Sequence, residues 1–159
     1  MATEAAAKKS KGLRLDAFKS DVEAETRGVW VDYATGERVC DPDAHDGLAL
    51  KVARAGNVRY QEALVRHGAT ARRRHPAGGD EGNLVDEGQR VARRLVAKFV
   101  LLDWRHLLDD DGNEIPYSLQ KAQEILAAPE YHQFYEDVIE IARDRELFAR
   151  TAEKEAMGN

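Results

Sequence analysis

Residues 29–40 read VWVDYATGERVC, and this stretch predicts a β-hairpin. Its first five residues alternate between two faces, with Val29, Val31 and Tyr33 on one of them, which is the two-residue period of a strand. The turn at 34–37 contains Gly36, which adopts a positive φ at little cost. Residues 38–40 return as the second strand, and Pro42 ends the hairpin because proline cannot donate to a β-ladder.

Apolar periodicity downstream of the hairpin predicts one further strand and four helices. Residues 48–52 alternate between apolar and smaller or charged residues, as expected of a third strand. The helices are predicted from helical spacing and from capping residues at their starts. They are expected over 58–66 after Asn57, from Asn83 to about Trp104, over 118–126 from Ser118, and from Pro129 to Phe148.

The predicted fold class is α+β: a small N-terminal antiparallel β unit, made of the hairpin plus a third strand, with a mainly α-helical C-terminal part. With 159 residues, the chain is long enough to fold without a metal or a disulfide. The predicted organisation is a mobile tail at 1–11, a β-rich unit with a short helix at 12–68, a basic and glycine-rich surface loop at 69–82, and a helical unit at 83–159.

The composition is that of a soluble globular protein, with 43% hydrophobic and 33% charged residues. Cys40 is the single cysteine, which excludes an intrachain disulfide and fits a reducing compartment. It is expected to be a small buried apolar residue rather than a nucleophile. No N-terminal apolar signal and no run of 18 apolar residues occur, so a cytoplasmic protein without membrane contact is expected.

Charge is distributed unevenly along the chain, although its net value is only −5. Residues 51–98 carry 11 basic and 5 acidic side chains, whereas residues 99–159 carry 6 basic and 14 acidic ones. This pattern fits a charge-complementary self-association, a polyanion-binding patch, or no specific role. The run Arg72-Arg73-Arg74 is the densest basic stretch, but the negative net charge and the lack of interleaved aromatics argue against nucleic-acid binding.

Motifs of catalysis and metal binding are absent from the sequence. The acidic turn at 109–114 looks like part of a calcium loop, but placing Gly112 at position 6 puts Leu107 and Ser118 where carboxylates are required. No two of the five histidines stand four residues apart, and no HExxH, GxSxG or phosphate-binding glycine motif occurs. We therefore expect no catalytic residue, no metal and no cofactor.

Two stretches of the chain carry a resemblance to a known family. The first runs from Gly28 to Gly36 and continues with residues 51–60, where a β unit leads into a helix that starts with Asn-x-x-Tyr. The second runs from Leu101-Leu102-Asp103-Trp104 through an acidic-glycine turn to Ile115-Pro116-Tyr117-Ser118. Over residues 27–67 and 90–148, this order resembles that of the tail assembly chaperones of long-tailed bacteriophages.

The resemblance implies a non-enzymatic protein of phage tail assembly in the host cytoplasm. Such chaperones bind the tape-measure protein, keep its apolar helical segments from aggregating, help to recruit tail-tube subunits, and are absent from the finished particle. Binding an amphipathic helix requires an apolar groove. The aromatic side chains of the C-terminal helices are either core residues or partner contacts. The candidates for partner binding are Trp104, Tyr117, Phe134, Tyr135 and Phe148.

Three other functions stay open at this point. A tail completion or adaptor protein would remain in the virion as a structural component. An enzyme with an unrecognised site would need a pocket of perturbed ionisable groups, for which Asp103, His106 and residues 109–111 are the nearest candidates. A nucleic-acid-associated regulator would use Arg72–Arg74 and would bind with a steep dependence on salt.

Overall fold

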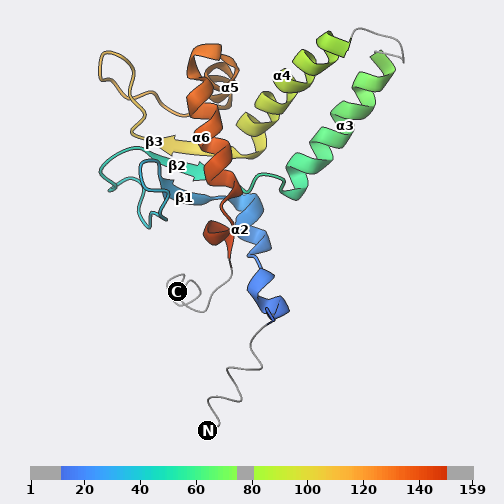
Figure 1. Cartoon of the computed structure of the whole chain (residues 1–159). Coiled ribbons are helices and arrows are strands. Elements are labelled where there is room, and N and C mark those ends of the chain that lie inside the picture. Colours follow the sequence, from blue (N-terminus) through green and yellow to red (C-terminus); the bar gives the residue numbers. More distant parts are fainter. Residues whose placement is uncertain (1–11, 75–80, 150–159) are drawn as a thin grey trace.

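The computed structural model describes residues 12–74 and 81–149, which form a three-stranded antiparallel sheet with helices around it (Figure 1). The predicted α+β class is confirmed. The predicted mobile tail, residues 1–11, lies outside the described residues.

The sheet is built around its central strand. β2 (Ala49–Val52) pairs with β1 (Val29–Asp32) on one side and with β3 (Leu101–Arg105) on the other, both antiparallel. One row across the sheet joins Val31, Leu50 and Trp104, and these three side chains are at most 2% exposed. Residues directly opposite each other in paired strands point to the same face, so this row is the inner surface of the sheet.

The third strand of the sheet does not come from the N-terminal part of the chain. The helix expected to reach about Trp104 ends earlier, since α4 covers Glu81–Phe99 and residues 101–105 form β3. The side chain of Asn57 donates to the carbonyl of Phe99, 3.0 Å away, which satisfies an acceptor at the end of the helix. Beyond that point, the chain gains ladder bonds along the free edge of β2. The sheet thus combines strands from both predicted units.

The predicted hairpin is only partly present. Residues 48–52 contain β2 as predicted, but β1 pairs with β2, and the returning arm of the hairpin is reduced to an isolated bridge between Val31 and Arg38. The turn between them is held by Asp32, whose carboxylate accepts from the amide of Thr35 at 2.9 Å and from His45 at 2.5 Å. The Thr35 amide and the His45 imidazole hold the pKa of the Asp32 carboxyl below its usual value.

Two long helices form an antiparallel hairpin that projects from the sheet (Figure 1). Asn57 caps the first of them as predicted, accepting from the amide of Tyr60 at 3.1 Å. This helix, α3 (Val58–Arg74), continues through Gly68, where a stop was expected. The predicted loop 69–82 is therefore wrong for residues 69–74 and 81–82, which are helical. In 69–74, the alanines and arginines are good helix formers, and they outweigh the cost of Gly68. Asn83 lies inside α4 rather than before it.

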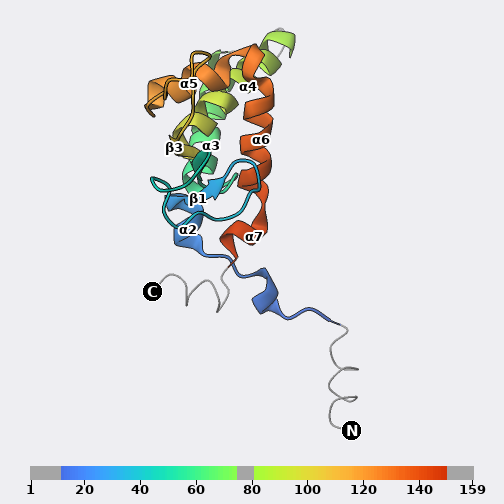
Figure 2. The same cartoon turned by 90° about the vertical axis from the view of Figure 1, so that its left-hand side faces the viewer.

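The C-terminal helices cover the inner face of the sheet (Figures 1 and 2). Ser118 caps α5 (Leu119–Ala127) as predicted, accepting from the amide of Lys121 at 3.0 Å. The single helix expected from Pro129 to Phe148 is divided into three pieces. They are η3 (Pro129–Tyr131), α6 (His132–Arg143) and α7 (Arg145–Phe148). Asp144 makes the second break, because its carboxylate caps α7 by accepting from the amide of Glu146 at 3.0 Å.

The N-terminal elements lie at one end of the molecule. η2 (Leu15–Phe18) leads into α2 (Val22–Arg27), whose first turn is capped by Asp21. A bridge between Ser20 and Ala149 ties this region to the end of α7. Gly28 then connects α2 to β1 with a φ of 87°.

Replacing Gly28 should destabilise the fold more than replacing Gly36. Both glycines have a positive φ, which costs an alanine backbone energy, and Gly28 with a ψ of 160° lies in a region that essentially only glycine adopts, at a cost of about 1–3 kcal/mol. At Gly28, a Cβ would also lie 2.8 Å from Cδ1 of Leu102 and 3.3 Å from the Val52 carbonyl, whereas nothing lies within 4 Å at Gly36. We expect Gly28→Ala to lower the free energy of unfolding by about 3 kcal/mol in denaturant titrations. Equal losses in the two variants would contradict the close packing at Gly28.

A tyrosine joins the end of β1 to α6. The Tyr33 hydroxyl donates to the carboxylate of Asp137, and its ring centroid lies 5.9 Å from that of Phe134. Burial, followed by the hydrogen bond to Asp137 and the charge of that carboxylate, raises the pKa of Tyr33 to about 12.

This contact predicts a loss of stability at alkaline pH. The folded state favours the neutral phenol, so the contribution of Tyr33 is fully present below pH 10 and is lost as the pH rises towards 12. The free energy of unfolding should therefore fall more steeply between pH 10 and 12 in the wild type than in Tyr33→Phe. Denaturant titrations of both proteins at several pH values measure the difference. Parallel pH profiles would show that Tyr33 does not carry this linkage.

Candidate functional site

Two of the five predicted partner-binding residues lie inside the core. Trp104 is 2% exposed and Phe148 is fully buried. The indole Nε1 of Trp104 donates to the carbonyl of Ile115 at 2.7 Å, and its ring meets the edge of Tyr117 with centroids 4.9 Å apart. In this structure, Trp104 and Phe148 are packing residues and offer no surface to a partner, since the sheet row and the C-terminal helices enclose them.

The other three predicted residues are half-buried and are not brought together. Tyr117 packs on Trp104, and burial, followed by the charge of Asp103, raises the pKa of its hydroxyl. Phe134 and Tyr135 are neighbours on α6, yet they line two different cavities. The aromatic residues therefore do not form one surface, and the two cavities have to be considered separately.

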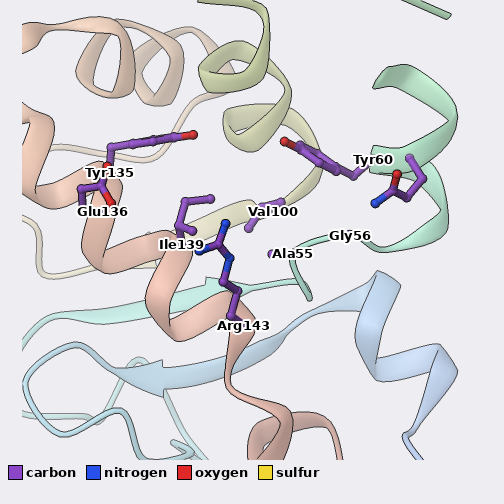
Figure 3. Close-up of a pocket in the computed structure, with 9 residues that line it drawn as sticks. Ala55, Gly56, Tyr60, Val100, Tyr135, Glu136, Ile139 and Arg143 are labelled. Atoms are coloured by element: carbon purple, nitrogen blue, oxygen red, sulfur yellow. The ribbon is translucent and has the colours of Figure 1, made fainter. Parts of the chain in front are cut away.

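The first cavity is a tyrosine pocket between the start of α3 and α6 (Figure 3). Its volume is about 400 Å³. The hydroxyls of Tyr60 and Tyr135 point towards each other across it, and Arg143 reaches in from the end of α6 (Figure 3). The guanidinium of Arg93 lies 4.6 Å from the centre of the Tyr135 ring. The lining residues are Ala55, Gly56, Tyr60, Gln61, Val100, Tyr135, Glu136, Ile139 and Arg143.

The tyrosine pocket is suited to holding a polar group. Both phenols carry their proton at neutral pH, as an unperturbed tyrosine does, and burial raises the pKa of the Tyr60 and Tyr135 hydroxyls further. A protonated phenol donates a hydrogen bond but does not act as a base.

The second cavity is an apolar groove between the loop at 107–115 and the elements α5, η3 and α6. It has a volume of about 510 Å³. Half-buried apolar side chains, among them Ile115, Ile125 and Phe134, line it together with Leu108, which is 54% exposed, and Tyr131, which is 48% exposed. The full set that we call the groove is Leu107, Leu108, Asp109, Asp110, Ile115, Lys121, Glu124, Ile125, Ala128, Glu130, Tyr131 and Phe134.

The loop that forms one wall of the groove is well ordered by its own hydrogen bonds. Asp109 accepts from the amides of Asp111 at 3.0 Å and Asn113 at 2.9 Å, and Gly112 supplies the positive φ that the turn requires. A bridge between Leu108 and Glu114 closes it. The sequence therefore correctly predicted a turn here, and this turn positions the exposed side chain of Leu108 on the wall of the groove.

The rim of the groove is acidic. Four carboxylates line it, from Asp109, Asp110, Glu124 and Glu130, against one amine from Lys121. That amine lies 3.5 Å from the Glu124 carboxylate, so most of the negative charge faces solvent without a basic partner in the groove. An apolar floor with an acidic rim suits a segment that is apolar on one side and basic at its edges.

Metal-ligating and nucleophilic side chains do not form a site in the described part of the chain. No group of three or more His, Cys, Asp or Glu residues there is arranged to hold a metal ion. His45 donates to Asp32 within the turn after β1, and His106 donates to Glu114 at 2.7 Å. The expectation that Cys40 is buried is wrong, because it lies exposed in the turn region that failed to form a full second strand.

Comparison with known proteins finds a match to a family of prophage proteins. Residues 55–159 match the family model described as YdaY prophage protein. The chain belongs to this family. The match contains every residue that lines the tyrosine pocket and the groove, whereas β1, β2 and the N-terminal elements precede it. No curated protein and no solved structure matches the chain. None of the described helices has the length and apolar character needed to span a membrane.

Sequence reasoning missed most of the groove. It selected Phe134 but not Leu107, Leu108, Ile115 or Ile125. The available signal was the position of apolar residues immediately on both sides of the acidic turn, because a closed turn brings its two flanks together.

Proposed function

We propose that this YdaY-family prophage protein is a non-enzymatic tail assembly chaperone whose groove holds an amphipathic helix of the tape-measure protein. The observation that carries the proposal is the groove itself, an apolar trough with exposed Leu108 and Tyr131 on its walls and four carboxylates on its rim. Helix-in-groove recognition uses this combination, in which the apolar face of the helix enters the groove.

The exposed side chains supply the driving force for such an interaction. Leu108 and Tyr131 leave about half of their surface in water, and a bound helix would remove that apolar surface from solvent. Tyrosine is enriched among residues that dominate binding energy, because its ring packs while its hydroxyl keeps a polar contact.

The acidic rim of the groove favours a client helix that carries basic side chains. A helix with lysines or arginines flanking its apolar face would place them beside Asp109, Asp110, Glu124 and Glu130. Rim charges of this kind set the orientation and the association rate more than the final affinity. A tape-measure helix with basic flanks is therefore the expected client, and tail-tube subunits would be recruited through surfaces outside the groove, in the cytoplasm of the host.

Co-expression with the tape-measure protein of the same prophage tests this proposal. The wild-type chain should keep that protein soluble and copurify with it, whereas the groove variant Leu108→Ser/Tyr131→Ser should reduce its capture at least tenfold. The matched control is Val58→Ser/Val65→Ser on α3, which also removes two exposed apolar side chains but lies outside the groove. This control should capture the client as the wild type does.

Three outcomes would reject the proposal. The tape-measure protein could be equally soluble without the chain, no complex could form, or both double variants could capture it equally well. A stoichiometric amount of this chain in purified phage particles would instead support the alternative of a structural tail completion or adaptor protein.

A further inference from the structure

The segment before α2 exposes apolar side chains to solvent. Leu13 is 78% exposed, Leu15 is 82% exposed and Phe18 is 58% exposed. Leu15 and Phe18 stand three residues apart in the 3₁₀ helix η2, so they lie on the same side of it. We call residues 13–19 the N-terminal segment. Apolar groups that gather at an exposed place on a soluble protein mark an interaction surface.

Hydrogen bonds join this segment to the body of the protein at its base, next to the end of α7. The amide of Asp21 donates to the carbonyl of Phe148 at 2.7 Å, and the bridge between Ser20 and Ala149 lies beside it. Further out, the guanidinium of Arg145 lies 5.9 Å from the centre of the Phe18 ring. No residue of η2 is buried, so the core gains nothing from these side chains.

The charge of the segment is opposite to that of the groove. The seven residues of the segment contain two basic side chains, Arg14 and Lys19, and one acidic one, Asp16. That one carboxylate, Asp16, is shared by Arg14 at 3.5 Å and Lys19 at 3.0 Å, so the segment keeps a net positive charge. The groove has four carboxylates and one amine at its rim. Apolar and basic features of the segment therefore match apolar and acidic features of the groove.

We propose that the N-terminal segment of one copy of this chain docks in the groove of a second copy. The segment lies at the opposite end of the molecule from α5 and from the loop after β3, which carry the groove residues, and it points away from the body (Figures 1 and 2). Docking therefore occurs between copies, in a head-to-tail arrangement. Such an interface is heterologous and continues into a ring or an open chain of subunits.

The same groove then serves two occupants. If it also holds the client helix, a point that rests on the proposed function, client binding displaces the neighbouring copy and self-association shields the groove until the client is present. Self-docking itself requires no client, so it can be tested on the isolated chain.

Sedimentation velocity of complementary variants tests the proposal on the full-length chain. The segment variant is Leu15→Ser/Phe18→Ser, and the groove variant is Leu108→Ser/Tyr131→Ser. All four positions are solvent-exposed, so circular dichroism should show unchanged folding. The wild type should grow beyond a dimer as its concentration rises, and each variant alone should stay monomeric. An equimolar mixture should form a dimer and nothing larger, because only one intact segment and one intact groove meet.

The α3 variant Val58→Ser/Val65→Ser serves again as the control and should associate as the wild type does. Raising the salt from 0.1 M to 0.5 M should weaken association of the wild type several-fold, because the rim charges become screened. A wild type that is monomeric at every concentration, variants that associate as well as the wild type, or a mixture that stays monomeric would each overturn the proposal. Loss of client capture in the groove variant together with a monomeric wild type would reject self-docking and leave the chaperone proposal standing.

Discussion

The structure depends on one row of side chains, in which Val31, Leu50 and Trp104 meet across the sheet and are enclosed by the C-terminal helices. Trp104 has a second task, because its indole holds the carbonyl of Ile115 and so fixes the loop that follows β3. That loop is a wall of the groove. The hydrophobic core and the candidate site are thus linked through a single ring, and the groove takes its shape from the packing of the sheet.

Local signals in the sequence were sufficient for the features that depend on neighbouring residues. The caps at Asn57 and Ser118 and the strand at β2 were predicted because each rests on a few adjacent positions. β3 was missed for the opposite reason. Residues 101–105 continue a helical apolar spacing, and what makes them a strand is the free edge of β2, about 50 residues away in the sequence.

The candidate site was harder to predict than the fold. Aromatic residues identify where apolar area is concentrated, but the sequence does not say which rings the core encloses. Trp104 and Phe148 are buried between the sheet and the C-terminal helices. Phe134 and Tyr135 are adjacent on α6 and point in different directions, so they line different cavities. Leu108 became exposed because the turn at Asp109 holds it there, through hydrogen bonds from two backbone amides to the Asp109 carboxylate rather than through hydrophobicity.

Asn57 gives the molecule a directional property. It is the buried polar residue of the described core, and its amide nitrogen donates to the carbonyls of Arg54 at 2.9 Å and Phe99 at 3.0 Å while its oxygen caps α3. A leucine there would fill a similar space. The Arg54 carbonyl would still accept from the backbone amide of residue 57 at 3.1 Å, but the Phe99 carbonyl and the Tyr60 amide would lose their side-chain partner, each costing about 1–3 kcal/mol. Apolar side chains can pack at many helix crossing angles. A side-chain amide with three fixed hydrogen-bond partners allows only one of these angles. The hydrogen bonds of Asn57 therefore set the angle at which α3 leaves the sheet.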